Sequence, residues 1–410
     1  MHNDSHSSVA HFNQILEEGL LGDEDNNFIL YDFNVLNAQL QKAKLAFGET
    51  FKHYVAVKTN PLGAVLEHIV SKGFGLECAS FEEVILAHSC GAQAIGWDSP
   101  AKTDNELRES DKLEGLLINA NSLNEAERAI ALNQTASIFL RINSEVDTGT
   151  HESMSVSGAF SKFGEPISNR AEIIDFVLSN KRITGLHIHA SSQTVDYAKT
   201  VEAIKSVVSL ADEINSHSPN TIRTINIGGG FPVNYHKGDE YDIQAYADQL
   251  KVACPGLFDG TYSACTEFGR YYHAYAGSTY SRIEDVKVFE NKQVVILNIG
   301  ADSFVREAYN QGVWYHEIIP IQQDTSASNK TLSTDFAGPL CFGGDFIAKN
   351  HTFPVTARNN WVCIKDTGAN TFSLWSRHCS RRFPMVIGYN NAYTILKEKE
   401  GIDQIVNFWK

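Results

Sequence analysis

The stretch HYVAVKTNP, residues 53–61, reads as a short strand that ends in a lysine and is then broken by a proline. Val55 and Val57 alternate with neighbours of another character, which is typical of a strand, and the Asn-Pro pair ends it. A lysine that is buried at such a place becomes a nucleophile that can form a Schiff base with an aldehyde. Lysines at strand ends more often extend their amine to solvent, so Lys58 alone does not decide its role.

From residue 52 onward, apolar β-branched runs alternate with segments of helical spacing. Strands are predicted at 53–58, 74–78, 94–98, 115–119, 137–142, 183–189, 222–227 and 262–267. Helices are predicted between them at 62–72, 81–89, 103–110, 123–132, 169–180, 197–216 and 241–252. This alternation is typical of an α/β fold with parallel strands, and eight strands predict a (β/α)8 barrel. A doubly wound open sheet has the same alternation and is the rival fold.

The sequence on both sides of this region predicts a second domain that is mainly β. After Ser278 the long helical periods are lost, and strands are predicted at 286–289, 293–298 and 361–365. A strand at 28–31 precedes a helix predicted at 34–47, and we assign that strand to the second domain. We therefore predict a barrel over 34–280 and a mainly β sandwich or barrel built from 1–33 and 281–410. Residues 1–26 are expected to be a mobile lead-in.

Composition and charge exclude several classes of partner. The chain has 410 residues and a net charge of −15, which argues against nucleic acid or an anionic membrane surface as the main partner. It contains no apolar run of about 18 residues and no apolar signal region near its first residue, so neither a membrane span nor secretion is expected. The 7 cysteines are scattered without a CxxC pair, which favours reduced thiols in a cytoplasmic protein.

Ionisable residues lie at the carboxyl ends of several predicted strands, where barrels place their chemistry. They include Lys58, Glu77, Arg141, His187, His189 and the Glu267 to Arg270 stretch. Each residue alone is weak evidence for a site, but together at one end of a barrel these residues predict an active site.

The run Gly228-Gly229-Gly230 follows the seventh predicted strand. Bare glycine amides can approach a phosphate closely and point several N–H groups at it. The run matches neither GxGxxG nor a Walker loop. A tight turn that needs positive φ explains it equally well.

Three further motifs carry polar groups that suit a cofactor or substrate. His189 and Ser192 could supply a ring that stacks and a hydroxyl that binds phosphate, although a core histidine is the commoner case. Glu267 could keep a pyridine nitrogen protonated, and Arg270 suits a phosphate; the alternative is a surface ion pair. Cys341 could donate a proton, although most free cysteines are simply buried.

Taken together and in order, these motifs resemble the fold-type III pyridoxal-phosphate decarboxylases, the family of diaminopimelate, ornithine and arginine decarboxylases. The likeness covers the chain from about residue 28 to about residue 390. It implies pyridoxal 5′-phosphate as cofactor, bound by the barrel domain, and decarboxylation of an α-amino acid, a carbon–carbon lyase reaction. It also implies a homodimer with active sites at the interface.

The resemblance also implies roles for individual residues. Lys58 would carry the cofactor, Glu77 and Arg141 would lie beside it, His189 would stack on its ring and Glu267 would face its ring nitrogen. The phosphate would be held by Ser192, Gly228, Gly229, Gly230 and Arg270, with Asn370 nearby. Cys341 would reach the active site from the neighbouring subunit. Arg306, Tyr309 and Asp345 would lie on the substrate side.

The chain departs from the family pattern on the substrate side. Phe342 stands where the family has an acidic residue that grips the distal amine of a diamino substrate. Asn370 stands where a tyrosine is usual, and Cys379 lies in a stretch that replaces a common Tyr-Asn ending. These changes argue against ordinary diaminopimelate, ornithine or lysine. Arg306 and Tyr309 are compatible with a distal carboxylate, which suggests a specialised or conjugated amino acid.

Three alternatives follow from the same residues. An amino-acid racemase of this fold type would place an arginine against the ring nitrogen, so Glu267 favours decarboxylation. The altered residues at 342, 370 and 379 leave room for a homologue that binds the cofactor without catalysis. An NAD-binding enzyme is the weakest alternative, because the glycine run lies late in the chain and lacks the acidic residue that this fold requires.

Overall fold

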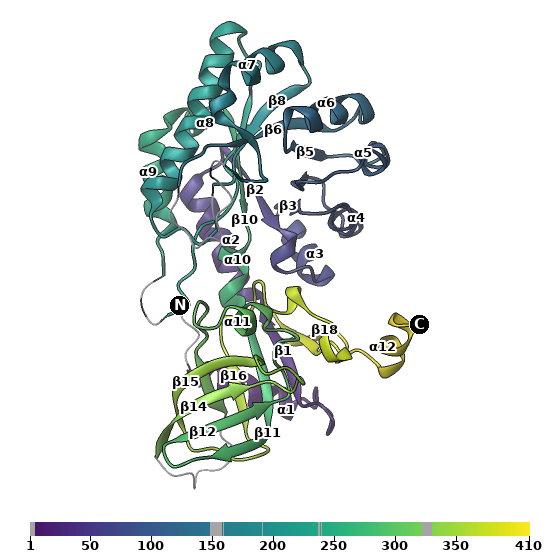
Figure 1. Ribbon diagram of the computed structural model, residues 1–410, viewed down its shortest axis with the longest axis vertical. Coiled ribbons are helices and arrows are strands. Elements are labelled where there is room, and N and C mark those ends of the chain that lie inside the picture. Colours follow the sequence, from purple (N-terminus) through teal and green to yellow (C-terminus); the bar gives the residue numbers. More distant parts are fainter. Residues whose placement is uncertain are drawn as a thin grey trace. The chain divides into compact units, whose positions relative to one another are not determined.

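The computed structural model describes residues 5–147, 158, 160–190, 192–236, 238, 240–321 and 330–410. The chain divides into two compact units (Figure 1). We call residues 39–233 and 240–272 the barrel unit, and residues 1–38, 234–239 and 273–410 the β unit. The boundaries thus lie at 38/39 and 272/273, and a short segment at 234–239 also belongs to the β unit.

The barrel unit is built on eight parallel strands. They are β2 (Phe51–Ala56), β3 (Gly75–Cys78), β4 (Ile95–Trp97), β5 (Leu116–Ala120), β6 (Ser137–Asn143), β8 (Ile183–His187), β9 (Thr224–Asn226) and β10 (Ser263–Phe268). Their order is β5-β4-β3-β2-β10-β9-β8-β6, and pairing of β5 with β6 closes the ring. Closure confirms the predicted (β/α)8 barrel and excludes the open sheet. A two-residue strand, β7 (Glu165–Pro166), adds to the end of β6.

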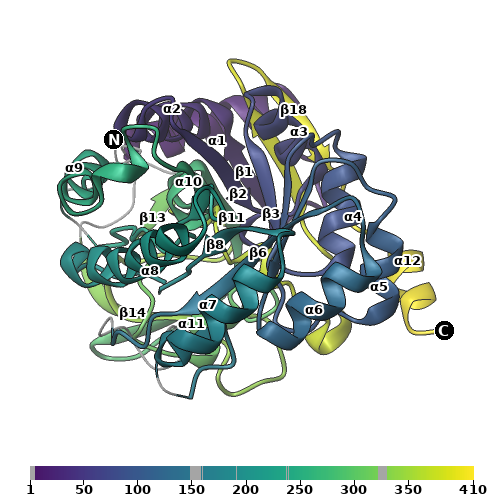
Figure 2. The same ribbon diagram turned by 90° about the horizontal axis from the view of Figure 1, so that it is seen from above.

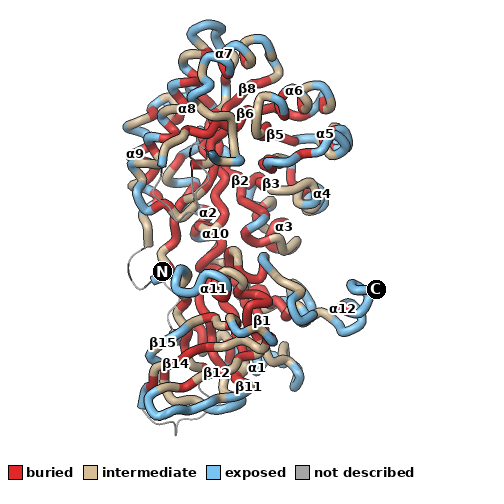
Figure 3. Tube along the Cα trace, viewed as in Figure 1, coloured by how far each residue is buried: buried red, intermediate tan, exposed pale blue. Residues whose placement is uncertain are grey.

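Helices flank these strands, as Figures 1 and 2 show. They are α2 (Phe33–Phe47), α3 (Gly63–Ser71), α4 (Phe81–Ser89), α5 (Asp104–Ser110), α6 (Leu123–Leu132), α7 (Arg170–Ser179), α8 (Tyr197–His217) and α9 (Ile243–Ala253). Ser80 and Ser122 accept hydrogen bonds from the backbone of Glu83 and Glu125, so α4 and α6 begin where the sequence predicts. Most strand residues are buried, because helices cover parallel strands (Figure 3).

The β unit contains one nine-stranded sheet. Its strands are β1 (Asn27–Asp32), β11 (Gly277–Val288), β12 (Lys292–Leu297), β13 (Ile318–Ile321), β14 (Thr331–Ala337), β15 (Phe346–Pro354), β16 (Trp361–Ile364), β17 (Met385–Tyr389) and β18 (Tyr393–Lys397). β1 lies between β11 and β17, which confirms that the N-terminal strand joins a mainly β domain. The short helices of this unit are α11 (Val305–Tyr309) and α12 (Ile402–Phe408), while helix α10 (Arg270–His273) spans the boundary at 272/273. Among the described residues, no helix has the length and apolar character needed to span a membrane.

The prediction of a mobile lead-in over 1–26 is wrong where the structure describes it. Residues Ser5–Glu17 form helix α1. Phe12 and Ile15 are fully buried, and the Phe12 ring lies 5.1 Å from that of Trp361 and 6.0 Å from that of Tyr280. The segment is polar and rich in histidine, but Phe12 and Ile15 lie three positions apart, so their side chains share one face of the helix.

Replacing Phe12 by alanine is expected to lower the free energy of unfolding by about 3–5 kcal/mol, because the cavity lies inside the aromatic core of the β unit. Urea unfolding followed by tryptophan fluorescence measures the change. The matched control is Leu16→Ala on the same helix, where the side chain is 41% exposed and a much smaller loss is expected. Equal losses in the two variants would contradict the packing of α1.

Candidate active site

Lys58 lies just beyond β2, in a single helical turn at Val57–Thr59. Its Nζ donates to both carboxylate oxygens of Glu77 in β3, at 2.9 and 2.7 Å. Glu77 is buried, whereas the Lys58 side chain is 43% exposed. Burial alone would lower the pKa of Lys58, but the charge and hydrogen bonds of Glu77 raise it. Burial raises the pKa of Glu77 to about 8, against the attraction of Lys58. Lys58 and Glu77 thus form an ion pair in which the carboxylate is buried and the lysine side chain is partly exposed.

Glu267 in β10 is held on both of its carboxylate oxygens. Oε1 accepts hydrogen bonds from the side-chain amides of Asn119 and Asn226, at 3.1 and 2.7 Å. Oε2 lies 3.0 Å from Nε2 of His187. Burial alone would raise the pKa of Glu267, but the charge and hydrogen bond of His187 lower it. The site therefore contains a buried carboxylate that stays ionised.

Asp98 joins this group, although the sequence analysis missed it. It follows β4 directly, and Nη1 of Arg141 donates to its two oxygens at 3.1 and 2.9 Å. Nδ1 of His187 lies 4.0 Å from Oδ1 of Asp98. Burial would raise the pKa of Asp98, but Arg141 and then His187 lower it. Arg141 was predicted to lie beside the cofactor; the structure pairs its guanidinium with Asp98 and stacks it on Phe163, 4.4 Å from the ring centre.

His189 lies against the glycine run. The Gly229 N–H donates to Nδ1 of His189 at 3.3 Å, and Gln193 N–H, next to Ser192, donates to the carbonyl of Gly230 at 3.1 Å. Gly228 has a φ of +68°, and a Cβ there would lie 2.3 Å from the carbonyl oxygen of Ile188. Burial, and then nearby Arg141 and Lys58, lower the pKa of His189 to about 3. A neutral imidazole and closely packed bare glycines therefore meet at this end of the barrel.

This donor set fits pyridoxal 5′-phosphate. Lys58 offers an amine, Glu267 an ionised carboxylate, and His189 a neutral ring. The glycine run offers backbone N–H groups, and Arg270, the first residue of α10, offers a cation. Gly96 lies between the two acids, because a Cβ there would be 3.7 Å from Oε1 of Glu267 and 3.9 Å from Cα of Glu77. Lys58 and Glu267 are thus brought to the same end of one barrel.

The remaining predicted site residues lie in the β unit. Tyr309 of α11 is exposed and stacks on Phe342, with ring centres 5.1 Å apart. The Phe342 ring also lies 5.7 Å from that of His378. Cys341, next to Phe342, is exposed. The thiol and the aromatic pair therefore belong to one surface of this unit.

Asp345 is buried, and its carboxylate accepts the backbone N–H groups of Ala301 and Leu340, at 2.6 and 2.7 Å. It therefore fixes the turn that carries Cys341. Asn370 adopts a positive φ of 55°, a conformation that asparagine tolerates. Its predicted contact with the phosphate stays a prediction.

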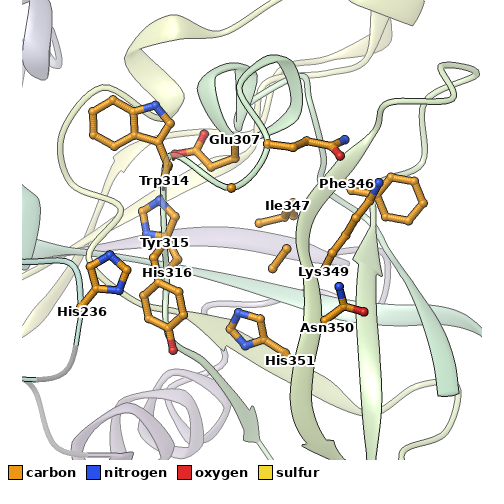
Figure 4. A pocket seen from close by; sticks show the side chains of 13 residues that line it. His236, Glu307, Trp314, Tyr315, His316, Phe346, Ile347, Lys349, Asn350 and His351 are labelled. Carbon is orange, nitrogen blue, oxygen red and sulfur yellow. Dashed lines mark hydrogen bonds and ion pairs between the residues drawn. The ribbon is translucent and has the colours of Figure 1, made fainter. Parts of the chain in front are cut away.

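Arg306 of α11 lies beside a cavity of about 380 Å³ within the β unit. Its guanidinium stacks on Trp314, 4.0 Å from the ring centre, and donates to Glu307 at 3.2 Å. Glu307 and Trp314 line the cavity, as Figure 4 shows. Nε2 of His316 lies 3.0 Å from Oε1 of Glu307, the same oxygen that accepts from Arg306. The sequence analysis did not identify Glu307, which neutralises part of the charge of Arg306.

Comparisons with known proteins agree with this site. Residues 34–274 match the family model for the pyridoxal binding domain of pyridoxal-dependent decarboxylases. Diaminopimelate decarboxylase from Campylobacter jejuni is 30% identical over 367 residues, which cover 86% of this chain and 88% of that protein. Diaminopimelate decarboxylase from Aquifex aeolicus is 28% identical over 388 residues, which cover 92% and 90%.

Solved structures share the fold. Diaminopimelate decarboxylase from Helicobacter pylori, complexed with L-lysine, has a TM-score of 0.86 at 23% identity, covering 97% of this chain and 99% of that chain. A lysine/ornithine decarboxylase from Vibrio vulnificus, complexed with cadaverine, has a TM-score of 0.80 at 22% identity, covering 94% and 99%. The family model spans more than half of this chain and includes Lys58, Glu77, His189 and Glu267. The chain belongs to the family of pyridoxal-dependent decarboxylases, lyases that use pyridoxal 5′-phosphate to remove the carboxyl group of amino acids.

Proposed function

We propose that the substrate is a specialised or conjugated α-amino acid that bears a distal carboxylate and no distal ammonium group. One observation carries the substrate class: Phe342, rather than an acid, stacks on Tyr309 beside the exposed Cys341. An aromatic surface offers no ionic partner to a primary ammonium, whereas the Arg306 guanidinium suits a carboxylate. Diaminopimelate itself is the second candidate, because the curated relatives carry that name.

Residues of the barrel unit hold the cofactor, and Cys341 of the β unit takes part in proton transfer. Lys58 holds the cofactor, and Glu77 accepts the proton that Nζ of Lys58 loses before the amine can attack an aldehyde. With the cofactor bound, His189 would stack on the ring and Glu267 would face its nitrogen. The glycine run, Ser192 and Arg270 would bind the phosphate. When bound, pyridoxal phosphate supplies a ring that takes up the electron pair left behind as carbon dioxide departs. Sγ of Cys341 or Nζ of Lys58 then returns a proton to Cα.

Replacing Phe342 by aspartate is expected to shift the preference toward diamino substrates. A new charged hydrogen bond to a distal ammonium is worth about 1.5–3 kcal/mol, so relative kcat/KM should rise by about ten- to a hundredfold. The measurement compares lysine, ornithine and diaminopimelate with amino acids that carry only a distal carboxylate. Phe342→Leu, which keeps an apolar side chain, is the control. An unchanged preference in the aspartate variant would remove position 342 from the substrate site.

The proposal includes a homodimer in which Cys341 acts on the partner's cofactor. Mixing a Lys58→Ala variant with a Cys341→Ala variant tests this, since subunit exchange leaves one intact site in each mixed dimer. Activity of about a quarter of wild type is then expected from two nearly inactive parents. If the mixture stays as inactive as its parents although exchange is demonstrated, Cys341 acts within its own subunit. A Cys341→Ala parent that is itself active would show that Cys341 has no role in the reaction. A cytoplasmic location stays a prediction.

A further inference from the structure

We propose that Arg141, Asp98 and His187 form a buried relay that orients Glu267 and keeps it ionised toward the ring nitrogen of the cofactor. Asp98 and His187 are then positioning residues, which act on the cofactor only through Glu267. The inference rests on the proposed role of Glu267.

The three relay residues and Glu267 form a row of four side chains. Asp98 accepts a hydrogen bond from Nη1 of Arg141 at 2.9 Å. Its Oδ1 lies 4.0 Å from Nδ1 of His187, which is too far for a hydrogen bond, so these two groups interact through charge alone. Nε2 of His187 lies 3.0 Å from Oε2 of Glu267. All four side chains are at least 95% buried, with 4, 5, 0 and 1% of their surface exposed. An ionised Glu267 can only accept, so Nε2 of His187 carries the hydrogen. The carboxylate of Asp98 then lies on the side of the imidazole away from Glu267.

The hydrogen bonds of Glu267 leave room for one more donor. A carboxylate has about four lone-pair sites, two on each oxygen. Among the described residues, Asn119 and Asn226 occupy both sites on Oε1, and His187 occupies one on Oε2. The open site on Oε2 suits a single N–H donor, which is what a protonated ring nitrogen presents.

Stability alone does not account for four charged or polar side chains at this place. Taking an ion pair out of water costs free energy, and well-packed apolar residues often serve a core better. The other titratable groups near the relay are Lys58, Glu77 and His189, which belong to the cofactor site, and the buried Lys102, which acts on Asp98 through its charge and is ion-paired with Glu125. The relay ends at the carboxylate of Glu267 in that site. The free energy lost by burying these charges is therefore explained by a function, which is to keep Glu267 fixed and ionised.

The test compares the affinity of the apoprotein for pyridoxal phosphate and for its 1-deaza analogue, in which C–H replaces the ring nitrogen. Both compounds keep the aldehyde and the phosphate, so their ratio isolates the contact with Glu267. The wild type is expected to prefer the nitrogen ring by about tenfold or more, as for a charged hydrogen bond. Asp98→Asn and His187→Ala should reduce this preference to about threefold or less, and His187→Gln, which keeps an N–H donor, should restore part of it.

The control is Asn133→Ala. Asn133 is fully buried in the same unit and hydrogen-bonds to Leu107 and Ser110, away from the relay. It should lower the melting temperature and leave the preference unchanged. If His187→Ala does not fold, Asp98→Asn, which changes a single side-chain atom, carries the test. A wild-type preference that both variants keep would overturn the relay. No preference in the wild type would instead overturn the role of Glu267 itself, and the relay with it.

Discussion

Replacing Lys58 by arginine or alanine is expected to abolish decarboxylation and to release the cofactor on dialysis. Neither side chain can bond to the aldehyde, and neither can return a proton to Cα as an amine does. Loss of a group with both roles should lower kcat by at least about a thousandfold. Arginine keeps a cation beside Glu77, so this variant separates lost chemistry from the cost of a buried, unpaired carboxylate.

Released carbon dioxide and the pyridoxal phosphate that remains after dialysis measure the effect. Lys52→Ala is the matched control, since Lys52 is an exposed residue of the same strand. It should keep both activity and cofactor. An arginine variant that folds, retains the cofactor through dialysis and turns over would show that Lys58 is not the site of attachment.

Replacing Glu267 by glutamine is expected to lower kcat by about a hundred- to a thousandfold, in the range seen when one preorganised electrostatic group is removed from an active site. The amide is neutral and no longer stabilises a protonated ring nitrogen, so the ring takes up electrons less well. Cofactor binding should weaken much less, because Lys58 and the glycine run are untouched.

Steady-state kinetics and cofactor affinity separate these effects. Glu213→Gln is the control, since Glu213 of α8 forms a partly exposed ion pair with Arg170 of α7 at 2.5 Å, in the helices of the barrel unit. That variant should change stability little and keep kcat within about threefold. A Glu267→Gln variant that also keeps kcat would remove Glu267 from the reaction and would favour a different partner for the ring nitrogen.

The sequence predicted the barrel well, because most of its strands are short apolar runs and several of its helices have a start signal. Helices α4 and α6 match their predicted bounds, since Ser80 and Ser122 cap them. The prediction of a mobile segment over residues 1–26 was wrong where the structure describes it. Helix α1 is stabilised by packing of Phe12 on Trp361, which lies far along the chain and leaves no local signal.

The site was only partly predictable. Lys58, Glu77 and Glu267 could be found because ionisable residues at strand ends are unusual. Asn119 and Asn226, which donate hydrogen bonds to Glu267, were not predicted, because a neutral amide at a strand end is not an unusual residue. Asp98 follows a strand of only three residues, but the rule that identified Glu77 could have found it. Its pairing with Arg141, 43 residues away, depends on the closed barrel and cannot be predicted from spacing.

The substrate side depends on contacts of another kind. The stacking of Phe342 on Tyr309 joins two segments whose sequences give no sign of each other. Asp345 was predicted to bind substrate, whereas its carboxylate is already held by two backbone N–H groups. A role for Asp345 in binding substrate stays a prediction. In the structure its carboxylate fixes the turn that carries Cys341.

The measurement that tests the central claim most directly is the location of the cofactor. The wild-type protein, loaded with pyridoxal phosphate, is reduced with borohydride, digested and analysed by mass spectrometry. We expect one modified peptide, with the reduced cofactor on Nζ of Lys58. Modification of another lysine, or none after loading, would contradict an active site built at the carboxyl end of β2.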